Sequence, residues 1–328
     1  MRIATWHADL SRDGPGLLLR DLRSGKEAQS LAAVEVLVRL DADVILLTDV
    51  DFDHDLLALA ELAARLEVAG SPYPHRFAAA PNRGVQTGLD LDGDGRIGGP
   101  RDAQGFGRFA GQGGMAVLSR LPLGEPADHS GFLWRDLPGN LMPEGPGGDI
   151  QRLSSTGHWA VPVILPDGGH LTLLAWHATP PVFDGPIARN AARNHDEAAF
   201  WLLLLEGRLP ISPPDPPFIL LGDANLDAED GDGRREAIRA LLAHPALQDP
   251  APRADHGRAQ DPGHRGDPAL DTALYARIGG LRVDYVLPSA GLEVRDSGVL
   301  WPAEGDGDAA LFARASRHYP VWVDIVLP

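Results

Sequence analysis

The sequence of 328 residues contains no cysteine, which excludes disulfide bonds, thiolate metal sites and a cysteine nucleophile. Aromatic residues make up only 6% of the chain. No stretch interleaves them with basic residues, as a platform that stacks nucleic-acid bases requires. Histidine, aspartate, glutamate and asparagine therefore remain as the obvious metal ligands, and an extended nucleic-acid platform is not indicated.

Positive charge is also scarce. Lys and Arg number 29 against 46 Asp and Glu, and the formal net charge is −17. A surface of this charge repels a polyanion at long range, so an extended nucleic acid is a disfavoured partner. Solubility is the plainer explanation of the acidity, and local metal sites remain compatible with it.

Long apolar runs are absent. No stretch approaches the about 20 apolar residues that a membrane-spanning helix needs. The segment Met1–Trp6 is too short and too interrupted for the apolar core of a signal peptide. We therefore expect a cytoplasmic protein without a membrane span, whose oligomeric state the sequence does not indicate.

Short apolar runs rich in Val, Ile and Leu recur along the whole chain, and each is followed by turn residues typical of strand ends. The expected strands are 2–6, 43–48, 115–118, 159–165, 171–176, 217–221, 281–287 and 320–327. Apolar residues at helical spacing predict helices at 27–40, 53–68, 194–206 and 232–243.

Strand follows strand without a helix over 115–176 and 281–327, which favours mixed, mostly antiparallel sheets over a doubly wound parallel sheet. No repeat or linker divides the chain, so we expect a single α/β domain over residues 1–328. Three long irregular segments rich in Gly, Pro and Asp are expected to frame a functional site, at 77–114, 124–158 and 244–280.

The apolar run 217–221 ends abruptly in Gly222-Asp223-Ala224-Asn225. An acid and an amide two residues apart can both face one side of a strand end. Such a pair can ligate a hard cation and hold a water or a phosphate oxygen. Alone, the motif is more often a simple turn.

Other strand boundaries carry polar residues that can bind metal or phosphate. They are His7 and Asp9, Asp49, His177, Asp284, and Arg317 with His318. Each residue alone has a plainer explanation, as a turn cap or a solvated histidine. Six short motifs in one order along the chain are more specific than any one of them.

In this order the motifs resemble the endonuclease/exonuclease/phosphatase superfamily, the deoxyribonuclease I-like metal-dependent phosphoesterases, over nearly the whole chain. The resemblance implies a four-layer α/β sandwich with two packed mixed, mostly antiparallel sheets and outer helices. It also implies a hydrolase that cleaves a phosphoester with water, while Mg²⁺ or Mn²⁺ offsets the charge of the phosphoryl oxygens.

The resemblance assigns a role to each matching residue. Asp223 orients or deprotonates the water, and Asn225 contacts the phosphate or the metal. His318 is the essential histidine, and Asp284 fixes its tautomer. His177 binds phosphate.

The sequence departs from the family at the principal metal, which most members hold with Asn, Glu and Asp. Those positions are His7, Asp49 and Arg317 here. We predict a remodelled site in which His7, Asp9, Asp49 and Asp223 bind Mg²⁺ or Mn²⁺, with Zn²⁺ as an alternative. Arg317 would then contact the phosphate directly.

The acidic charge favours a small phosphomonoester or phosphodiester as substrate. A nuclease acting on DNA or RNA is one alternative. A non-catalytic binding or scaffold protein with an altered metal site is the other.

A second cation site is predicted in the segment 90–96, where Asp90, Asp92 and Asp94 have the spacing of the first half of a calcium loop. The residue at the twelfth loop position is Arg101 instead of Glu. We expect a structural Ca²⁺ here, with a solvated acidic turn as the alternative.

Overall fold

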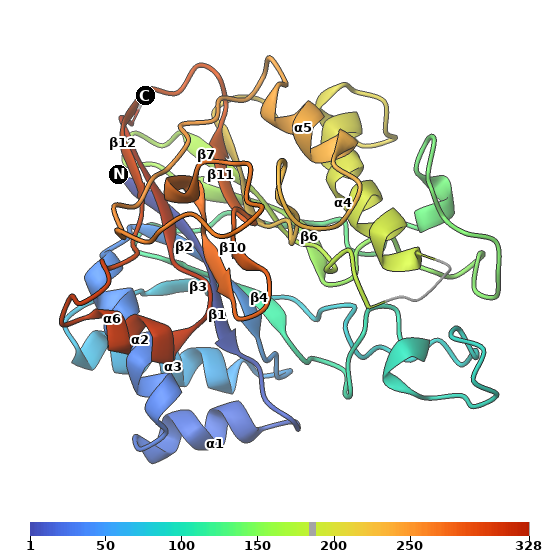
Figure 1. Ribbon diagram of the computed structural model, residues 1–328, viewed down its shortest axis with the longest axis horizontal. Helices are drawn as coiled ribbons and strands as arrows, with labels where there is room; N and C mark the ends of the chain where they lie inside the picture. The colour runs from blue at the N-terminus through green and yellow to red at the C-terminus, as the bar shows by residue number, and fades with distance from the viewer. Residues whose placement is uncertain (184–187, 328) are drawn as a thin grey trace.

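Two β-sheets pack face to face in the computed structural model, which describes residues 1–183 and 188–327 (Figure 1). The first sheet has the strand order β12 (Val294–Val299), β13 (Val321–Ile325), β1 (Arg2–Leu10), β2 (Val44–Val50), β4 (Gly114–Ser119) and β3 (His75–Phe77). The second has the order β11 (Asp284–Pro288), β8 (Phe218–Asp223), β7 (His170–His177), β6 (Gly157–Ile164) and β5 (Ala127–Asp128). Neighbouring strands in both sheets are antiparallel except for two parallel pairs, β1 with β2 and β7 with β8.

The second sheet is buried on both faces. Successive side chains of a strand point to opposite sides, and here each side packs into a different core. On β7, Leu173 and Ala175 belong to the core shared with the first sheet. Leu174 and Trp176, between and after them, belong to a separate core beneath the helices of the other side. Near-continuous apolar strands are therefore the sequence signature of this sheet.

Helices form the two outer layers (Figure 1). On the side of the first sheet lie α1 (Leu17–Ser24), α2 (Ala28–Leu40), α3 (Leu57–Val68) and α6 (Ala309–Ala315). On the side of the second sheet lie α4 (Arg189–Leu205) and α5 (Glu236–Leu242). The predicted four-layer sandwich is confirmed. In the described part of the chain, no helix combines the length and the hydropathy needed to cross a membrane.

The predicted strand 281–287 is wrong as a single element. Its beginning forms a hairpin, β10 (Gly279–Leu281) with β9 (Ala273–Tyr275), and β11 starts only at Asp284. Between them, the backbone N–H of Arg282 donates to Asp227, and that of Val283 donates to the Thr272 hydroxyl. Side chains therefore take the bonds that a neighbouring strand would have made.

The predicted helices over 53–68 and 232–243 begin later, at Leu57 and Glu236. The carboxylate of Asp53 accepts hydrogen bonds from the backbone N–H groups of Leu57 and Ala58, so the acid lies before the helix and not within it. The short helices α1 and α6 were not expected.

A buried glutamate on α4, Glu197, holds two loop segments next to the helix by hydrogen bonds. The Glu197 carboxylate accepts hydrogen bonds from the backbone N–H groups of Ser155 and Thr179. Burial raises the pKa of Glu197 to about 7, although nearby Arg193 and these hydrogen bonds lower it. The folded protein therefore holds a proton on Glu197 at a pH where the unfolded chain has lost it.

This proton makes stability depend on pH. Because the folded-state pKa is raised above the unfolded value, the stabilisation from Glu197 is full below about pH 4.5 and is lost as the pH rises through about 7. We expect Glu197→Gln to melt at a temperature that changes less between pH 5 and pH 8 than that of the wild type. Melting curves across this range test the effect, and equal slopes would show that Glu197 does not titrate there.

Candidate active site

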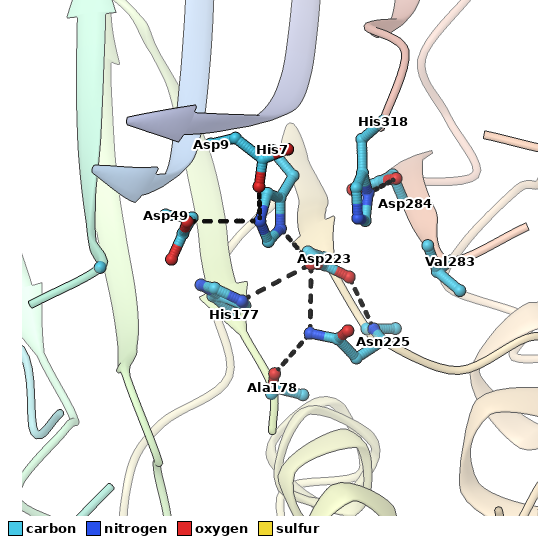
Figure 2. A network of polar contacts seen from close by, with 12 residues as sticks. His7, Asp9, Asp49, His177, Ala178, Asp223, Asn225, Val283, Asp284 and His318 are labelled. Atoms are coloured by element: carbon cyan, nitrogen blue, oxygen red, sulfur yellow. Dashed lines mark hydrogen bonds and ion pairs between the residues drawn. The ribbon is translucent and has the colours of Figure 1, made fainter. Parts of the chain in front are cut away.

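The strand ends of both sheets meet at one place (Figure 2). The parallel pairs bring His7 of β1 next to Asp49 of β2, and His177 of β7 next to Asp223 of β8. His318 lies just before β13, and its side chain points toward the same place. Residues from the strand-end motifs of both sheets therefore lie close together.

His7 lies at the centre of three carboxylates. Its Nδ1 is 2.7 Å from Oδ2 of Asp223, and its Nε2 is 3.3 Å from Asp9 Oδ1 and 3.6 Å from Asp49 Oδ2. Burial alone would lower the pKa of His7, but the hydrogen bonds to the three acids raise it well above its usual value. His7 is thus an imidazolium that lies between Asp9 and Asp49 on one side and Asp223 on the other.

Asp9 and Asp49 both have left-handed backbone conformations, with φ of 50° and 55°. The register of their strands shifts at these points, as it does at a β-bulge, and this bends the strand ends. Each acid also contacts a guanidinium. Arg83 Nη1 lies 2.9 Å from Asp49 Oδ1, and Arg317 Nη2 lies 3.4 Å from Asp9 Oδ1.

The group of His7, Asp9 and Asp49 fits a divalent cation. One ligand atom from each residue lies within 4.8 Å of the others. A set of one imidazole nitrogen and two carboxylate oxygens suits Mn²⁺ or Zn²⁺ better than a set of oxygens alone. Binding requires His7 to release its Nε2 proton, so the ion competes with protons at this position.

Asp223, which was predicted as a fourth ligand, lies on the other side of the His7 ring. It groups instead with His7 and His177, and with Asp284 and His318. Burial opposes its ionisation, but the hydrogen bond from His7 and the nearby histidines lower its pKa to about 2. Asp223 is therefore ionised, and it lies between the pair His7 and His177 and the pair Asp284 and His318.

The backbone at the end of β8 orients Asp223. Asn225 has φ of 49°, and its backbone N–H donates to Asp223 Oδ1 at 2.7 Å. Its side-chain amide donates to the carbonyl of Ala178 at 2.8 Å and to Asp223 Oδ2 at 3.1 Å. The predicted Asp-x-Asn pair is thus one rigid hydrogen-bonded unit.

His318 and Asp284 form a second buried pair. His318 Nδ1 lies 2.8 Å from Asp284 Oδ2, which also accepts a hydrogen bond from the Thr272 hydroxyl. Burial, opposed by the charge of His318, raises the pKa of Asp284. The His318 ring stacks on that of His7, with centroids 4.1 Å apart, which places both imidazoles in one group.

His177 is the neutral histidine of the site. Burial lowers its pKa to about 3, and Nε2 lies 3.5 Å from Asp223 Oδ2. Its Nδ1 is buried and has no hydrogen-bond partner among the described residues. An unpaired polar atom in this position is available to a bound ligand.

Two residues of the site were not predicted from the sequence. The hydroxyl of Tyr275 lies 3.3 Å from His318 Nε2, and Arg83 pairs with Asp49. Both come from segments that the sequence shows only as irregular, 77–114 and 244–280. The pair Gly279-Gly280 was the one local sign of the hairpin that carries Tyr275.

The site opens into a cavity of about 1380 Å³. All three predicted irregular segments contribute to its wall, for example through Arg83, Gln151 and Tyr275, so the prediction that they frame the site is confirmed. His7, His177, Asn225, Arg317 and His318 line the same cavity.

The predicted calcium loop gathers Asp90, Asp92 and Asp94, whose ligand oxygens lie within 4.8 Å of one another. The carboxylates already accept backbone N–H groups of the loop; Asp90 accepts those of Gly93 and Gly95. The same geometry occurs in a solvated turn, so calcium binding stays a prediction.

Residues 19–318 match the profile of the Endonuclease/Exonuclease/phosphatase family. No curated protein sequence matches the chain significantly. Among solved structures, an endonuclease/exonuclease/phosphatase from Beutenbergia cavernae is 21% identical with a TM-score of 0.59, over 100% of this chain and 71% of the other.

Two further solved structures match over 100% of both chains. A mannosyl-6-phosphatase from Bacteroides thetaiotaomicron is 15% identical with a TM-score of 0.52, and a 3'-5' exonuclease from Neisseria meningitidis is 16% identical with a TM-score of 0.51. At such identities these likenesses concern the fold. The match of the family profile to most of the sequence shows that the chain belongs to the endonuclease/exonuclease/phosphatase family.

Proposed function

We propose that the protein is a metal-dependent phosphoesterase that hydrolyses a small phosphorylated molecule. The observation that carries this proposal is the buried Asp223 carboxylate, held beside the His318–Asp284 pair by His7 and Asn225, which line a large cavity together with His318. This arrangement can orient a water, receive a phosphoryl group and accommodate the rest of a substrate.

His7, Asp9 and Asp49 would hold the divalent ion, with Mg²⁺ or Mn²⁺ favoured by the resemblance and Zn²⁺ compatible with the nitrogen ligand. When bound, the ion supplies positive charge that stabilises the phosphoryl oxygens in the transition state.

The protein's own residues position the reactants. With a pKa of about 2, Asp223 is ionised and accepts a hydrogen bond from the attacking water. It is a weak base, so its principal contribution is to orient the water. Asp284 holds His318 at Nδ1. His318 Nε2, near the Tyr275 hydroxyl, is then the ring atom that can bond to the phosphoryl or leaving-group oxygen.

Phosphate binding is assigned to three further residues. His177 and Asn225 both line the cavity, and His177 Nδ1 has no hydrogen-bond partner among the described residues. Arg317, with a side chain 57% exposed, reaches Asp9 only at 3.4 Å and can turn toward an anion. A small substrate is favoured over nucleic acid because the chain carries a net charge of −17.

One observation favours a second candidate, a phosphate-binding protein that does not catalyse. His7, Arg83 and Arg317 already place positive charge on Asp9, Asp49 and Asp223 without any metal. Such a site can bind an anion even if hydrolysis has been lost.

The decisive experiment is a matrix of divalent metals against substrates on the purified protein. It combines Mg²⁺, Mn²⁺ and Zn²⁺ with sugar phosphates, nucleotides, phosphodiesters and short oligonucleotides. We expect hydrolysis of small phosphoesters that EDTA abolishes and added metal restores. No measurable hydrolysis in any combination, with phosphate binding retained, would support the non-catalytic candidate. Preferential hydrolysis of oligonucleotides would support a nuclease.

A further inference from the structure

The cavity extends beyond the strand ends to the start of α4. There its wall includes Arg189, the first residue of that helix, together with Gln151, Leu91 and Arg101. These residues do not contact the cluster around His7 in any hydrogen bond or ion pair of the described residues. The cavity therefore has a second polar region beside the proposed reaction site.

Arg189 is a half-buried cation without an acidic partner among the residues that the structure describes. Its guanidinium donates to the carbonyl of Leu91 at 3.3 Å and to the side-chain oxygen of Gln151. Within residues 1–183 and 188–327, no carboxylate lies at ion-pair distance from it. Burial alone lowers its pKa, and no acid opposes this effect. By contrast, Arg83 and Arg317 each contact an aspartate.

A desolvated guanidinium with unused N–H groups is unfavourable unless an anion reaches it. Its planar fork matches the oxygens of a phosphate or a carboxylate. The neutral oxygens of Leu91 and Gln151 hold the side chain in place without neutralising it. The charge therefore remains available to a ligand in the cavity.

The same helix fixes Arg189 relative to the reaction site. Asn194 donates hydrogen bonds of 2.7 Å to the carbonyls of Thr179 and Ala224, and Ala224 lies between Asp223 and Asn225. Arg189 precedes Asn194 by five residues, about 7.5 Å along the helix axis. A ligand of sugar-phosphate or nucleotide size can span such a separation.

We propose that Arg189 forms a second anion subsite, which binds a phosphate or carboxylate group of the substrate other than the one being hydrolysed. This inference rests on the proposed function and narrows its substrate class. The preferred substrate is a small phosphoester that carries a second anionic group. Arg101, exposed on the cavity wall, adds positive charge on the same side.

Binding can be measured with little turnover in an Asp223→Asn background. Calorimetry would compare two matched ligand pairs, fructose 1,6-bisphosphate with fructose 6-phosphate, and 3-phosphoglycerate with glycerol 3-phosphate. The first pair tests a second phosphate, and the second tests a carboxylate. We expect the doubly anionic member of at least one pair to bind 10-fold tighter or more, which is about 1.4 kcal/mol.

Adding Arg189→Gln should remove that preference and leave the affinity for the singly anionic ligand unchanged. Arg189→Lys should restore part of it. The control is Arg208→Gln, the same loss of charge just beyond the other end of α4, where Arg208 is 59% exposed and pairs with Glu206. This control should behave like the parent.

Equal affinities within both pairs, or an equal loss for both members of a pair in Arg189→Gln, would overturn the subsite. So would an effect of Arg208→Gln as large as that of Arg189→Gln. Failure of the proposed function has a different signature, because the binding preference would persist while the protein with Asp223 intact hydrolysed no phosphoester.

Discussion

Replacing Asp223 with Asn is expected to lower kcat about 1000-fold with little change in the folded structure, because a positioned acid or base contributes about 100-fold to 10,000-fold. The amide has the same shape and can still accept the backbone N–H of Asn225. It loses the negative charge that orients water and that pairs with His7 at 2.7 Å. Rate constants on the best substrate of the matrix, measured with saturating metal, test this expectation.

Asp296→Asn serves as the matched control, since Asp296 is an exposed acid on β12, remote from the strand ends. It should keep the wild-type rate. Activity that survived in Asp223→Asn within a factor of ten would mean that another group positions the water, and our assignment of Asp223 would be wrong.

Replacing His7 with Phe is expected to have the largest effect on stability. In the presence of EDTA, the change leaves the buried carboxylate of Asp223 and the partly buried carboxylates of Asp9 and Asp49 without their shared cation. Removing one partner of a buried charge pair costs about 3 to 5 kcal/mol, and we expect a loss near the lower value. Urea unfolding at pH 7 measures it.

The matched control is His158→Phe, which also replaces a buried histidine. Burial lowers the pKa of His158 to about 3, so this ring is neutral, and within residues 1–183 and 188–327 its one hydrogen bond goes to the carbonyl of Glu197. Its loss should cost only about 1 kcal/mol. If both variants lost the same stability, His7 would not be acting as a cation.

Two further outcomes connect His7 with the metal. Because the variant lacks the imidazole nitrogen, its affinity for Mn²⁺ or Zn²⁺ should fall at least about 10-fold. Adding Asp223→Asn to His7→Phe should recover part of the lost stability, since the fully buried carboxylate that paired with His7 then no longer carries a charge. Unchanged metal affinity in the single variant would place the ion elsewhere.

The architecture could be predicted because it depends on patterns that act over short distances. Apolar runs such as 217–221 and 171–176 are strands that are buried on both faces, and turn residues mark their ends. The residues at these ends could be predicted too, because a fold that brings strand ends together also brings Asp223 near His177.

The electrostatics of the site could not be predicted. His7 and Asp223 are 216 positions apart, and nothing local to either indicates that one is the counter-ion of the other. The sequence shows His7 as a substituted metal ligand, whereas the structure adds its role as an imidazolium between three acids. Arg83 and Tyr275 stayed unrecognised because their segments have no periodic pattern, and Arg189 because the predicted helix began only at residue 194. Only the tertiary fold brings the three to the cavity.

The pairing of β1 with β13 has a consequence for how the protein assembles. Trp6 donates from its indole N–H to the carbonyl of His318, and the backbone of Arg2 lies opposite Asp324. A nascent chain on the ribosome lacks these partners until residues 318–325 have been made. Contacts of such long sequence separation slow folding. Until β13 has been made, one edge of β1 is unpaired and can associate with another chain. The stacking of His7 on His318 likewise forms only after residue 318 has been made.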